Sequence, residues 1–500
     1  MRLLFVLVLS GLFLAAFGDV LDVGSRKQLF LDKRFVTNDS GIQLVMNPAI
    51  KMETVIRPDR PWESGWIVGY GTVLEDGGKF RMWYTALPAE GPIDQTESAA
   101  LVCYAESRDG IRWMKPDLGV FDWHGSKANN IVLRAGIETS TVFVDPKAPE
   151  AERYKLISVY YDKDKSPEGS GIYIYVSPDG LHWRLNPTRL YPFTPDSQNQ
   201  AFFDPRIGKY VIYLRKWDPL RKIGRIETDA ILKPWPYDRT AKPARTWGKD
   251  RTPPPGAEIP TAFGYDSQDP EPSDHYTSAA VQYPWAQDVY FMFPSAYLHY
   301  PNPPKGRFRN DGPVDIQMAV SRDGVTYWRV DRKPYVDLGL AGEPDGGSIY
   351  MLVGMLRTGN WISQYYSAYP FTHGAYHGLK QETQIGSIVR LAQRPDGFVS
   401  ADASYSGGSF VTPPLSFQGK RLSLNMNASA MGEVQVEVQD ERGKALEGYS
   451  FADADPLHQN SLSQIVSWGG KPDISSLAGK TIRLAFRMRS VKLYAFQFSE

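Results

Sequence analysis

Ser107-Arg108-Asp109-Gly110-Ile111-Arg112-Trp113 is a short stretch whose Ser-x-Asp-Gly core returns twice in the chain. The second copy runs from Ser177 to Trp183, and the third runs from Ser321 to Trp328. The three starting positions fit a repeat of about 70 residues with one copy missing. A degraded copy, from Glu227 to Trp235, lies close to the missing position. We therefore expect a fold that is built from repeats.

Each copy of the turn follows a strand-like run, and a second hairpin lies upstream of it. An Asp-Gly pair after alternating apolar residues is a hairpin signal. The strand-like runs span 99–106, 171–176 and 314–320, and the upstream hairpins span 73–84, 142–158, 201–213, 279–294 and 349–366. Five units of two hairpins predict five four-stranded blades. The expected fold class is all-β, with a five-bladed β-propeller followed by a C-terminal β-sandwich.

The domain boundaries follow from where these patterns begin and end. We assign residues 19–403 to the propeller, with the blades over 45–403 and the segment 29–36 completing or covering them. The Pro-rich insert 233–272 has almost no periodicity, and we interpret it as a surface lid over one end of the propeller. After Thr412-Pro413-Pro414 come short alternating strands, which predict a β-sandwich over 404–500.

Composition and charge limit the classes of partner. Lys plus Arg and Asp plus Glu each number 56, so no excess of basic residues favours nucleic acid or an anionic membrane. An uncharged carbohydrate is the easier substrate to assume. Aromatic residues make up 13% of the chain, and such rings pack against sugar faces, although propeller cores also use many of them.

The first 18 residues have the pattern of a secretory signal peptide. Arg2 supplies the positive charge, Leu3 to Phe17 the apolar stretch, and Ala16-Phe17-Gly18 a cleavage site. No later segment has the length of a membrane span. Cys103 is the only cysteine, so the chain forms no intrachain disulfide and no thiolate metal cluster. We expect a secreted or periplasmic protein, of bacterial type.

Acidic residues near the start of each innermost strand are the candidate catalytic groups. Inner strands of a propeller start at one mouth of the channel, so these residues are expected to converge. Converging carboxylates supply the acid and the base of glycoside hydrolysis. The alternative is that acids in loops cap strands or face solvent. The candidate catalytic residues are Glu63, Glu138, Asp196 and Asp345, and Asp274 and Glu343 are acids assigned to substrate binding.

The remaining candidates are residues that would hold or orient a sugar. Arg81 and Arg215 could orient a carboxylate or a hydroxyl, unless they form structural pairs between strands. We assign Trp62, His275 and Tyr276 to substrate binding as well. No cofactor is expected, although a structural calcium ion in the channel is left open. His373 and His377 are four residues apart, but Gly374 argues against a metal-binding helix there.

This layout resembles the five-bladed propeller superfamily of glycoside hydrolases that includes the arabinanase/xylosidase family 43 and the invertase-like family 32. The resemblance rests on the blade count, the Ser-x-Asp-Gly turns, the acids and the trailing sandwich. It implies a base or nucleophile at Glu63, a pKa-setting acid at Glu138 and a general acid at Asp196. The sequence lacks the families' Trp-Met-Asn-Asp-Pro-Asn-Gly, Arg-Asp-Pro and Glu-Cys motifs.

Three functions are kept open by the sequence. The first is a secreted glycoside hydrolase that acts on a poly- or oligosaccharide. The second is a non-catalytic carbohydrate-binding propeller, which has no need for two acids within reach of one glycosidic bond. The third, less favoured, is a sialidase-like enzyme, because the turns are similar to the Asp-box of sialidases but one residue shorter. That function needs an arginine triad, for which Arg81, Arg215 and Arg357 are the candidates.

Overall fold

The computed structural model describes residues 19–89, 100–134, 141–160, 167–196, 198–242, 252–286, 288–302, 310–375 and 385–500. Within these ranges the chain is all-β, and its helices are short 3-10 turns. No helix of the described part has the length and hydrophobicity that crossing a membrane would require. The expected signal segment, residues 1–18, lies outside the described residues.

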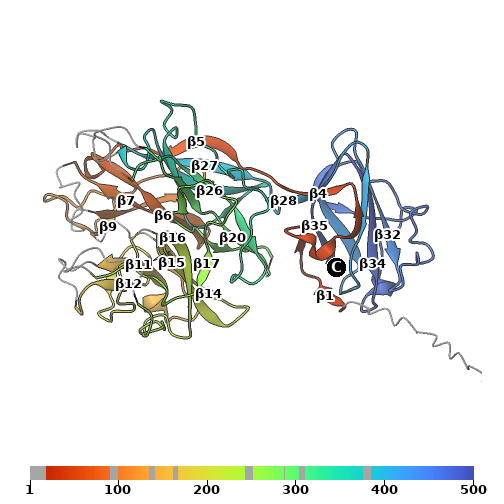
Figure 1. The fold of residues 1–500 in the computed structure, drawn as a ribbon, viewed down its shortest axis with the longest axis horizontal. Helices are drawn as coiled ribbons and strands as arrows, with labels where there is room; N and C mark the ends of the chain where they lie inside the picture. The colour runs from red at the N-terminus through yellow and green to blue at the C-terminus, as the bar shows by residue number, and fades with distance from the viewer. Residues whose placement is uncertain are drawn as a thin grey trace, which may run out of the picture. The chain divides into compact units, whose positions relative to one another are not determined.

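The chain divides into two compact units. The large unit is Val45–Ser400, and the small unit combines the segment up to Leu44 with Ala401–Glu500. Figure 1 shows the red N-terminal strand β1 (Leu21–Gly24) in one body with the blue C-terminal strands.

The N-terminal segment therefore differs from our expectation. We assigned residues 19–44 to the propeller, whereas β2 (Gln28–Leu29) pairs with β35 (Val491–Ser499). Phe30 and Phe35 are fully buried in the core of the small unit. The physical reason is that these apolar side chains complete a core whose other residues come from the end of the chain.

The large unit contains three four-stranded antiparallel sheets that follow one another along the chain (Figure 1). The first sheet has strands β6 (Trp66–Asp76), β7 (Lys79–Leu87), β8 (Leu101–Ser107) and β9 (Ile131–Arg134). The second has β10 (Thr141–Val144), β11 (Tyr154–Tyr160), β12 (Gly171–Ser177) and β13 (Arg184–Leu185). The third has β14 (Gln200–Asp204), β15 (Lys209–Trp217), β16 (Arg221–Thr228) and β17 (Thr261–Phe263).

The later part of the large unit forms two further sheets. A three-stranded sheet has the order β19 (Val281–Gln282), β20 (Tyr290–Met292) and β23 (Ala319–Ser321). A longer sheet runs β18 (Ser273–His275), β21 (Ser295–Leu298), β22 (Val314–Ile316), β24 (Ser348–Met351), β26 (Trp361–Tyr369), β27 (Ser387–Gln393) and β5 (Ile50–Ile56), and β25 (Leu356–Thr358) pairs with β26. The early strand β5 is thus an edge of a sheet made mainly by the end of the unit.

The insert and the degraded repeat differ from their sequence interpretation. After β16 the chain makes no Asp-Gly hairpin, and the fourth strand of the third sheet, β17, comes from within the insert. Trp235 is buried against Tyr191, and Trp217 donates its backbone N–H to the carbonyl of Pro255. The described parts of the insert therefore contribute to the packing of the third sheet, which a lid would not do.

The Ser-x-Asp-Gly turns have one geometry at all three positions. In the first, Ser107 Oγ accepts from the backbone N–H groups of Asp109 and Gly110. Asp109 Oδ1 accepts from the backbone N–H groups of Ile111 and Arg112, each at 2.8 Å. The turns at Ser177 and Ser321 repeat these contacts. The side chains satisfy backbone donors that a tight turn leaves without partners, which explains the recurring sequence.

Each turn is also held by an aromatic residue of another sheet. Trp83 of the first sheet donates to the carbonyl of Gly180 at 2.8 Å, and Tyr213 of the third donates to that of Gly324. Tyr365 of β26 donates to the carbonyl of Gly110 at 2.6 Å. The last contact joins the end of the large unit to its first sheet.

A second repeated contact pairs a tyrosine with an acid of the preceding sheet. Tyr154 donates to Asp76, Tyr210 to Asp145 at 2.9 Å and Tyr290 to Asp204 at 2.5 Å. Burial, followed by the hydrogen bond to its acid, raises the pKa of each tyrosine above the usual range. Each tyrosine therefore stays protonated and acts as the donor.

Contacts between inner segments join several parts of the large unit. Val142 binds Thr72, Thr141 binds Asn199, and Ala280 binds Gln200. β22 and β24 pair at Val314 and Ser348, and Val353 donates to the carbonyl of Gly71. The last contact returns to the first sheet.

The small unit buries one apolar core between its sheets. One sheet has the order β33 (Asn460–Ile465), β31 (Arg421–Asn427), β35, β28 (Val399–Ala403) and β4 (Ile42–Met46), and the other has β3 (Thr37–Ser40), β29 (Gly408–Val411), β34 (Arg483–Arg489) and β32 (Glu433–Gln439). β1 runs parallel to β30 (Leu415–Phe417). The predicted strands at 422–426, 433–438, 481–486 and 493–498 are confirmed by β31, β32, β34 and β35.

We predict that Gly180→Ala destabilises the large unit more than Gly77→Ala. Both glycines have positive φ, at 78° and 61°, so each substitution costs about 1–2 kcal/mol of backbone strain. A Cβ on Gly180 would lie 2.7 Å from Trp83 Cζ2, whereas a Cβ on Gly77 meets nothing within 4 Å. Overpacking adds a further 1–3 kcal/mol or so at Gly180 alone. Chemical denaturation measures the difference, and equal losses would contradict this account of the turn.

Candidate functional site

A group of charged and aromatic side chains gathers where strands of several sheets of the large unit begin or end. We call it the Asp196 cluster, and it comprises Tyr70, Asp196, Arg215, Arg221, Asp274, Tyr276, Tyr297, His299, Tyr350 and His373. Its members come from β6, β15, β16, β18, β21, β24 and neighbouring loops. Residues far apart in the sequence therefore meet at one place.

Asp196 is the acid of the cluster that reaches solvent. Its side chain is 28% exposed and forms an ion pair with Arg215, whose side chain is 1% exposed. The Arg215 guanidinium lies 3.7 Å from the ring centre of Tyr276 and donates to the Tyr276 carbonyl. Burial alone would lower the pKa of Arg215, but Asp196 and Tyr276 outweigh it and raise the pKa. Arg215 is thus a fixed cation that orients Asp196.

A second ion pair lies deeper in the cluster. Arg221 Nη1 binds Asp274 Oδ2 at 2.9 Å, and His299 Nε2 lies 3.2 Å from the same oxygen. Burial would raise the pKa of Asp274, but the hydrogen bond from His299 and the charge of Arg221 lower it overall. Asp274 Oδ1 is buried and has no hydrogen-bond partner among the described residues.

Aromatic rings fill the space between these ion pairs. The ring centre of Tyr276 lies 5.9 Å from those of Tyr297 and Tyr350 and 4.5 Å from that of His373. Tyr70 lies 6.2 Å from Tyr350. Burial, followed by the neighbouring Tyr276, raises the pKa of Tyr70 well above its usual range. Tyr70 enters the cluster because β6 has a register shift between Val68 and Gly71.

The backbone around Asp196 is strained at residues other than glycine. Asp196, Gln198 and Ala279 have φ of 69°, 44° and 38°. Gln198 accepts from the Ala279 N–H at 2.7 Å and donates to the Met351 carbonyl at 2.8 Å. Such conformations persist only where surrounding contacts determine them, and they concentrate at functional sites.

Four of the predicted site residues meet in this cluster: Asp196, Arg215, Asp274 and Tyr276. Glu63 and Trp62 have contacts of a different kind. Glu63 is fully buried and accepts from Tyr84 at 2.6 Å, Lys115 at 2.7 Å and two backbone N–H groups. Trp62 donates to Asn130 at 2.8 Å within the core of the first sheet. These contacts fit a structural role better than a catalytic one.

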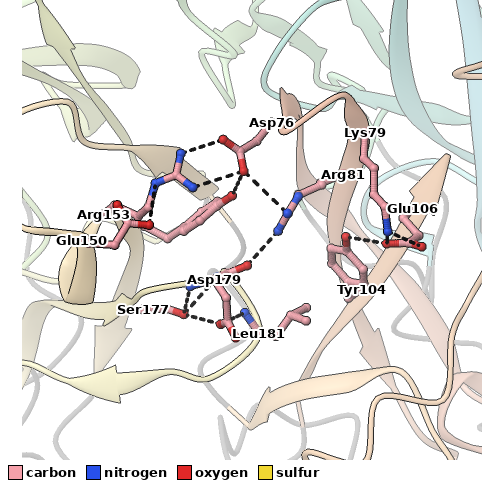
Figure 2. A network of polar contacts seen from close by, with 12 residues as sticks. Asp76, Lys79, Arg81, Tyr104, Glu106, Glu150, Arg153, Ser177, Asp179 and Leu181 are labelled. Carbon is pink, nitrogen blue, oxygen red and sulfur yellow. Dashed lines mark hydrogen bonds and ion pairs between the residues drawn. The ribbon is translucent and has the colours of Figure 1, made fainter. Parts of the chain in front are cut away.

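Arg81 lies in a polar network that joins the first two sheets, as Figure 2 shows. It donates to the Asp179 carbonyl at 2.7 Å and lies 3.5 Å from Asp76, which also binds Arg153. The structural alternative that we considered for Arg81 accounts for these contacts. Arg215, in contrast, lies in the Asp196 cluster, and Arg357 donates to the Gly359 carbonyl. The described contacts thus do not assemble the arginine triad of a sialidase.

The remaining acids are distributed elsewhere. Asp345 accepts from Lys51 at 2.7 Å and from Tyr366 at 2.8 Å, and Glu343 accepts from the Leu340 N–H within its own turn. Glu138 and His377 lie outside the described residues. Within the described ranges, no group of three or more His, Cys, Asp and Glu side chains could hold a metal ion.

His275 faces away from the cluster. Successive strand residues point to opposite faces, and the cross-strand row His275, Ala296, Asp315 lies opposite the row of Asp274. Burial lowers the pKa of His275 to about 4. Burial, together with the charge of Asp337, raises the pKa of Asp315 to about 7. Asp315 Oδ1 and His275 Nδ1 have no hydrogen-bond partner among the described residues.

Sequence reasoning missed most of the residues that surround Asp196. Tyr350 lies in the predicted hairpin 349–366, whereas Tyr70 precedes the predicted hairpin 73–84. The register shift that turns Tyr70 inward has no sequence signal beyond Gly69 and Gly71. Arg221 starts β16, and an Arg at a strand start was not considered. His373 was considered only for a metal, whereas its ring contacts Tyr276.

Comparisons with known proteins give distant similarities. No family model matches the chain. Two curated relatives, the uncharacterized proteins MT1551 and Rv1502 of Mycobacterium tuberculosis strains, are each 27% identical over 153 residues, which are 29% of this chain and 46% of each relative. The chain thus spans about half the length of the curated relatives that it matches.

The similar solved structures include named carbohydrate enzymes. A glycosyl hydrolase from Bacteroides ovatus has a TM-score of 0.41 and 14% identity, over 76% of this chain and 99% of that one. A structure described with the GH130 family of mannoside phosphorylases has 0.40 and 14%, over 75% and 99%. An N-acetylgalactosamine deacetylase from F. plautii has 0.42 and 12%, over 72% and 97%. Likeness at this level carries no argument about this chain.

We predict that Glu63→Gln destabilises the protein by about 1.5–3 kcal/mol, because Lys115 loses its buried carboxylate partner and keeps only the exposed Asp59, at 2.7 Å, as a counter-charge. The Lys115 side chain is only 7% exposed. The exposed Glu75→Gln is the matched control. Urea denaturation measures the loss. A Glu63→Gln protein as stable as the control would contradict the structural role and return Glu63 to the list of catalytic candidates.

We predict that Asp315→Asn changes how stability depends on pH. The pKa of Asp315 is about 7 in the folded protein and 3.8 ordinarily, so the folded state binds the proton more tightly. The wild-type free energy of unfolding should therefore fall, relative to the variant, as pH rises from about 4 to 7, by at most about 4 kcal/mol. Urea denaturation at a series of pH values measures this, and parallel curves would contradict it.

Proposed function

We propose that this chain is a glycoside hydrolase whose active site is the Asp196 cluster. The observation that carries the proposal is the solvent-reaching carboxylate of Asp196. Its backbone is strained, a buried arginine binds it, and tyrosines that pack edge to face lie beside it. Sugar rings pack on aromatic faces, while carboxylates carry out the chemistry. The predicted signal segment, residues 1–18, supports placing this activity outside the cytoplasm, and the substrate is a poly- or oligosaccharide.

The fold that we propose for the large unit is a five-bladed propeller, and for the small unit a β-sandwich. A contact between the late and the early part of the unit supports the propeller, because Val353 donates to the carbonyl of Gly71. The bond from Tyr365 to Gly110 supports the same closure. In this arrangement the start of β14 and the end of β18 face the same mouth of the propeller channel, and Asp196 and Tyr276 meet there. Two sheets around a single core support the sandwich.

Within this proposal Asp196 is the base or the nucleophile rather than the general acid that the family resemblance implied. Its ion pair with Arg215 is formed by the carboxylate form, and this form attacks an anomeric carbon or activates a water. The reaction also needs a proton donor for the leaving oxygen. Asp274 and Glu138 are the two acids to test for that role.

The alternative function is carbohydrate binding without catalysis. One observation favours it: Asp274 is 2% exposed and bound by Arg221 and His299, which leaves Asp196 as the solvent-reaching acid of the described cluster. A binding site needs only one such polar group beside aromatic rings. Catalysis and binding therefore differ in whether a second acid of the site takes part.

We predict that Asp196→Asn lowers the rate of sugar release by about 10²–10⁴-fold, as expected for loss of a group that takes part in proton transfer or attack. The exposed Asp117→Asn is the matched control. The measurement is release of reducing sugar from a panel of glycosides and polysaccharides, with Asp274→Asn and Glu138→Gln in the same series. Binding of the substrate should persist in Asp196→Asn.

Two results would argue against the hydrolase. Wild-type protein that binds a glycan of the panel but releases no sugar from any would support the binding function. Full activity of Asp196→Asn at unchanged stability would remove the Asp196 cluster as the active site.

A further inference from the structure

A groove of about 580 Å³ lies on the large unit, and the Asp196 cluster does not contribute to it. It is lined by residues of β5, β27 and the β25–β26 hairpin and by the Ser-x-Asp-Gly turn of the first sheet, at 108–111. We propose that this groove is a second carbohydrate site, which binds an acidic segment of a polysaccharide. This inference rests on one part of the proposed function, namely that the chain encounters carbohydrate.

The groove exposes an unusual amount of apolar side chain. Ile50, Met52, Ile111 and Trp361 line it and are 53%, 42%, 43% and 45% exposed. Trp361 starts β26 opposite Thr358, across a tight hairpin at Gly359. Its neighbour Ile362 is fully buried, so strand alternation directs the indole toward solvent. An exposed apolar patch that includes an aromatic ring indicates a binding surface.

Three arginines line the groove, and two of them, Arg108 and Arg357, have no carboxylate partner among the described residues. Arg390 is bound by both oxygens of Glu53, at 2.6 and 3.0 Å. Asp109 uses Oδ1 for the turn, and hydrogen bonds from the Arg112 and Ile111 amides help to lower its pKa. Arg108 and Arg357 have no ion pair with any acid of the described ranges.

The ligand class follows from this combination. A sugar ring stacks on Trp361, and a planar guanidinium binds a carboxylate or a sulfate through paired hydrogen bonds. A neutral glycan would use the ring and leave both cations without a partner. The structure therefore favours a polysaccharide with acidic groups, whether uronic acid or sulfate ester. Polygalacturonate, which carries carboxylates only, and dextran sulfate, which carries sulfate esters only, represent the two sources, and dextran is the neutral comparison.

The test is affinity gel electrophoresis of the full chain with these three polymers. The variants are Trp361→Ala, the double variant Arg108→Gln/Arg357→Gln, and Asp196→Asn. Tyr405→Ala, which removes another exposed aromatic ring, is the matched control, and thermal unfolding confirms that each variant is folded. We expect wild-type protein to bind at least one acidic polymer, and both groove variants to bind it at least about 10-fold more weakly. Added salt should weaken wild-type binding.

Asp196→Asn and Tyr405→Ala should bind like wild type, which separates this site from the proposed active site. Failure of hydrolysis with retained, groove-dependent binding would overturn the proposed function alone. Three results would overturn the groove proposal: no binding of either acidic polymer, equal binding of dextran, or binding unchanged in both groove variants. A change from dimer to monomer in Trp361→Ala would also overturn it, because a second copy would then be the occupant.

Discussion

The large unit depends on buried hydrogen bonds that cross from one sheet to the next. Tyr154, Tyr210 and Tyr290 each donate to an acid of the preceding sheet, and a hydrogen bond to a charged group contributes about 1.5–3 kcal/mol. Apolar packing alone would let two sheets slide against each other, since dispersion contacts have little direction. A tyrosine bound to a carboxylate fixes both the distance and the register of the pair.

This fixed register is what allows loops of different sheets to build one site. Asp196 precedes β14, and Tyr276 follows β18. Arg215 binds both residues, which requires that the third sheet and the sheet of β18 keep a fixed position relative to each other. The glutamine contacts of Gln198 serve the same purpose, because they bind the strained loop to Ala279 and Met351. The strain at Asp196 is thus supported by contacts from the rest of the unit, which is the condition under which such backbone strain persists.

The repeat and the strands were predictable because their signals are local. Ser107, Asp109 and Gly110 satisfy one turn within a few residues, so the pattern is visible in the sequence. Asp196, Asp274 and Tyr276 were found because residues before the predicted inner strands were expected to converge, and Arg215 because it could orient a carboxylate. Glu63 was assigned a catalytic role because it also precedes an inner strand. Its contacts to Tyr84 and Lys115 depend on packing between segments, which local sequence does not show.

The contrast between Glu63 and Asp196 shows why a carboxylate near a strand start is not by itself a catalytic signal. Both residues form an ion pair with a buried cation, so pairing does not separate them. Exposure does: the Glu63 side chain is sealed from solvent, whereas that of Asp196 is 28% exposed. A substrate must touch the reacting oxygen, so only the second arrangement permits chemistry. The two residues also differ in backbone conformation, because Asp196 has a left-handed φ of 69° whereas Glu63 ends the 3-10 turn Pro61–Glu63.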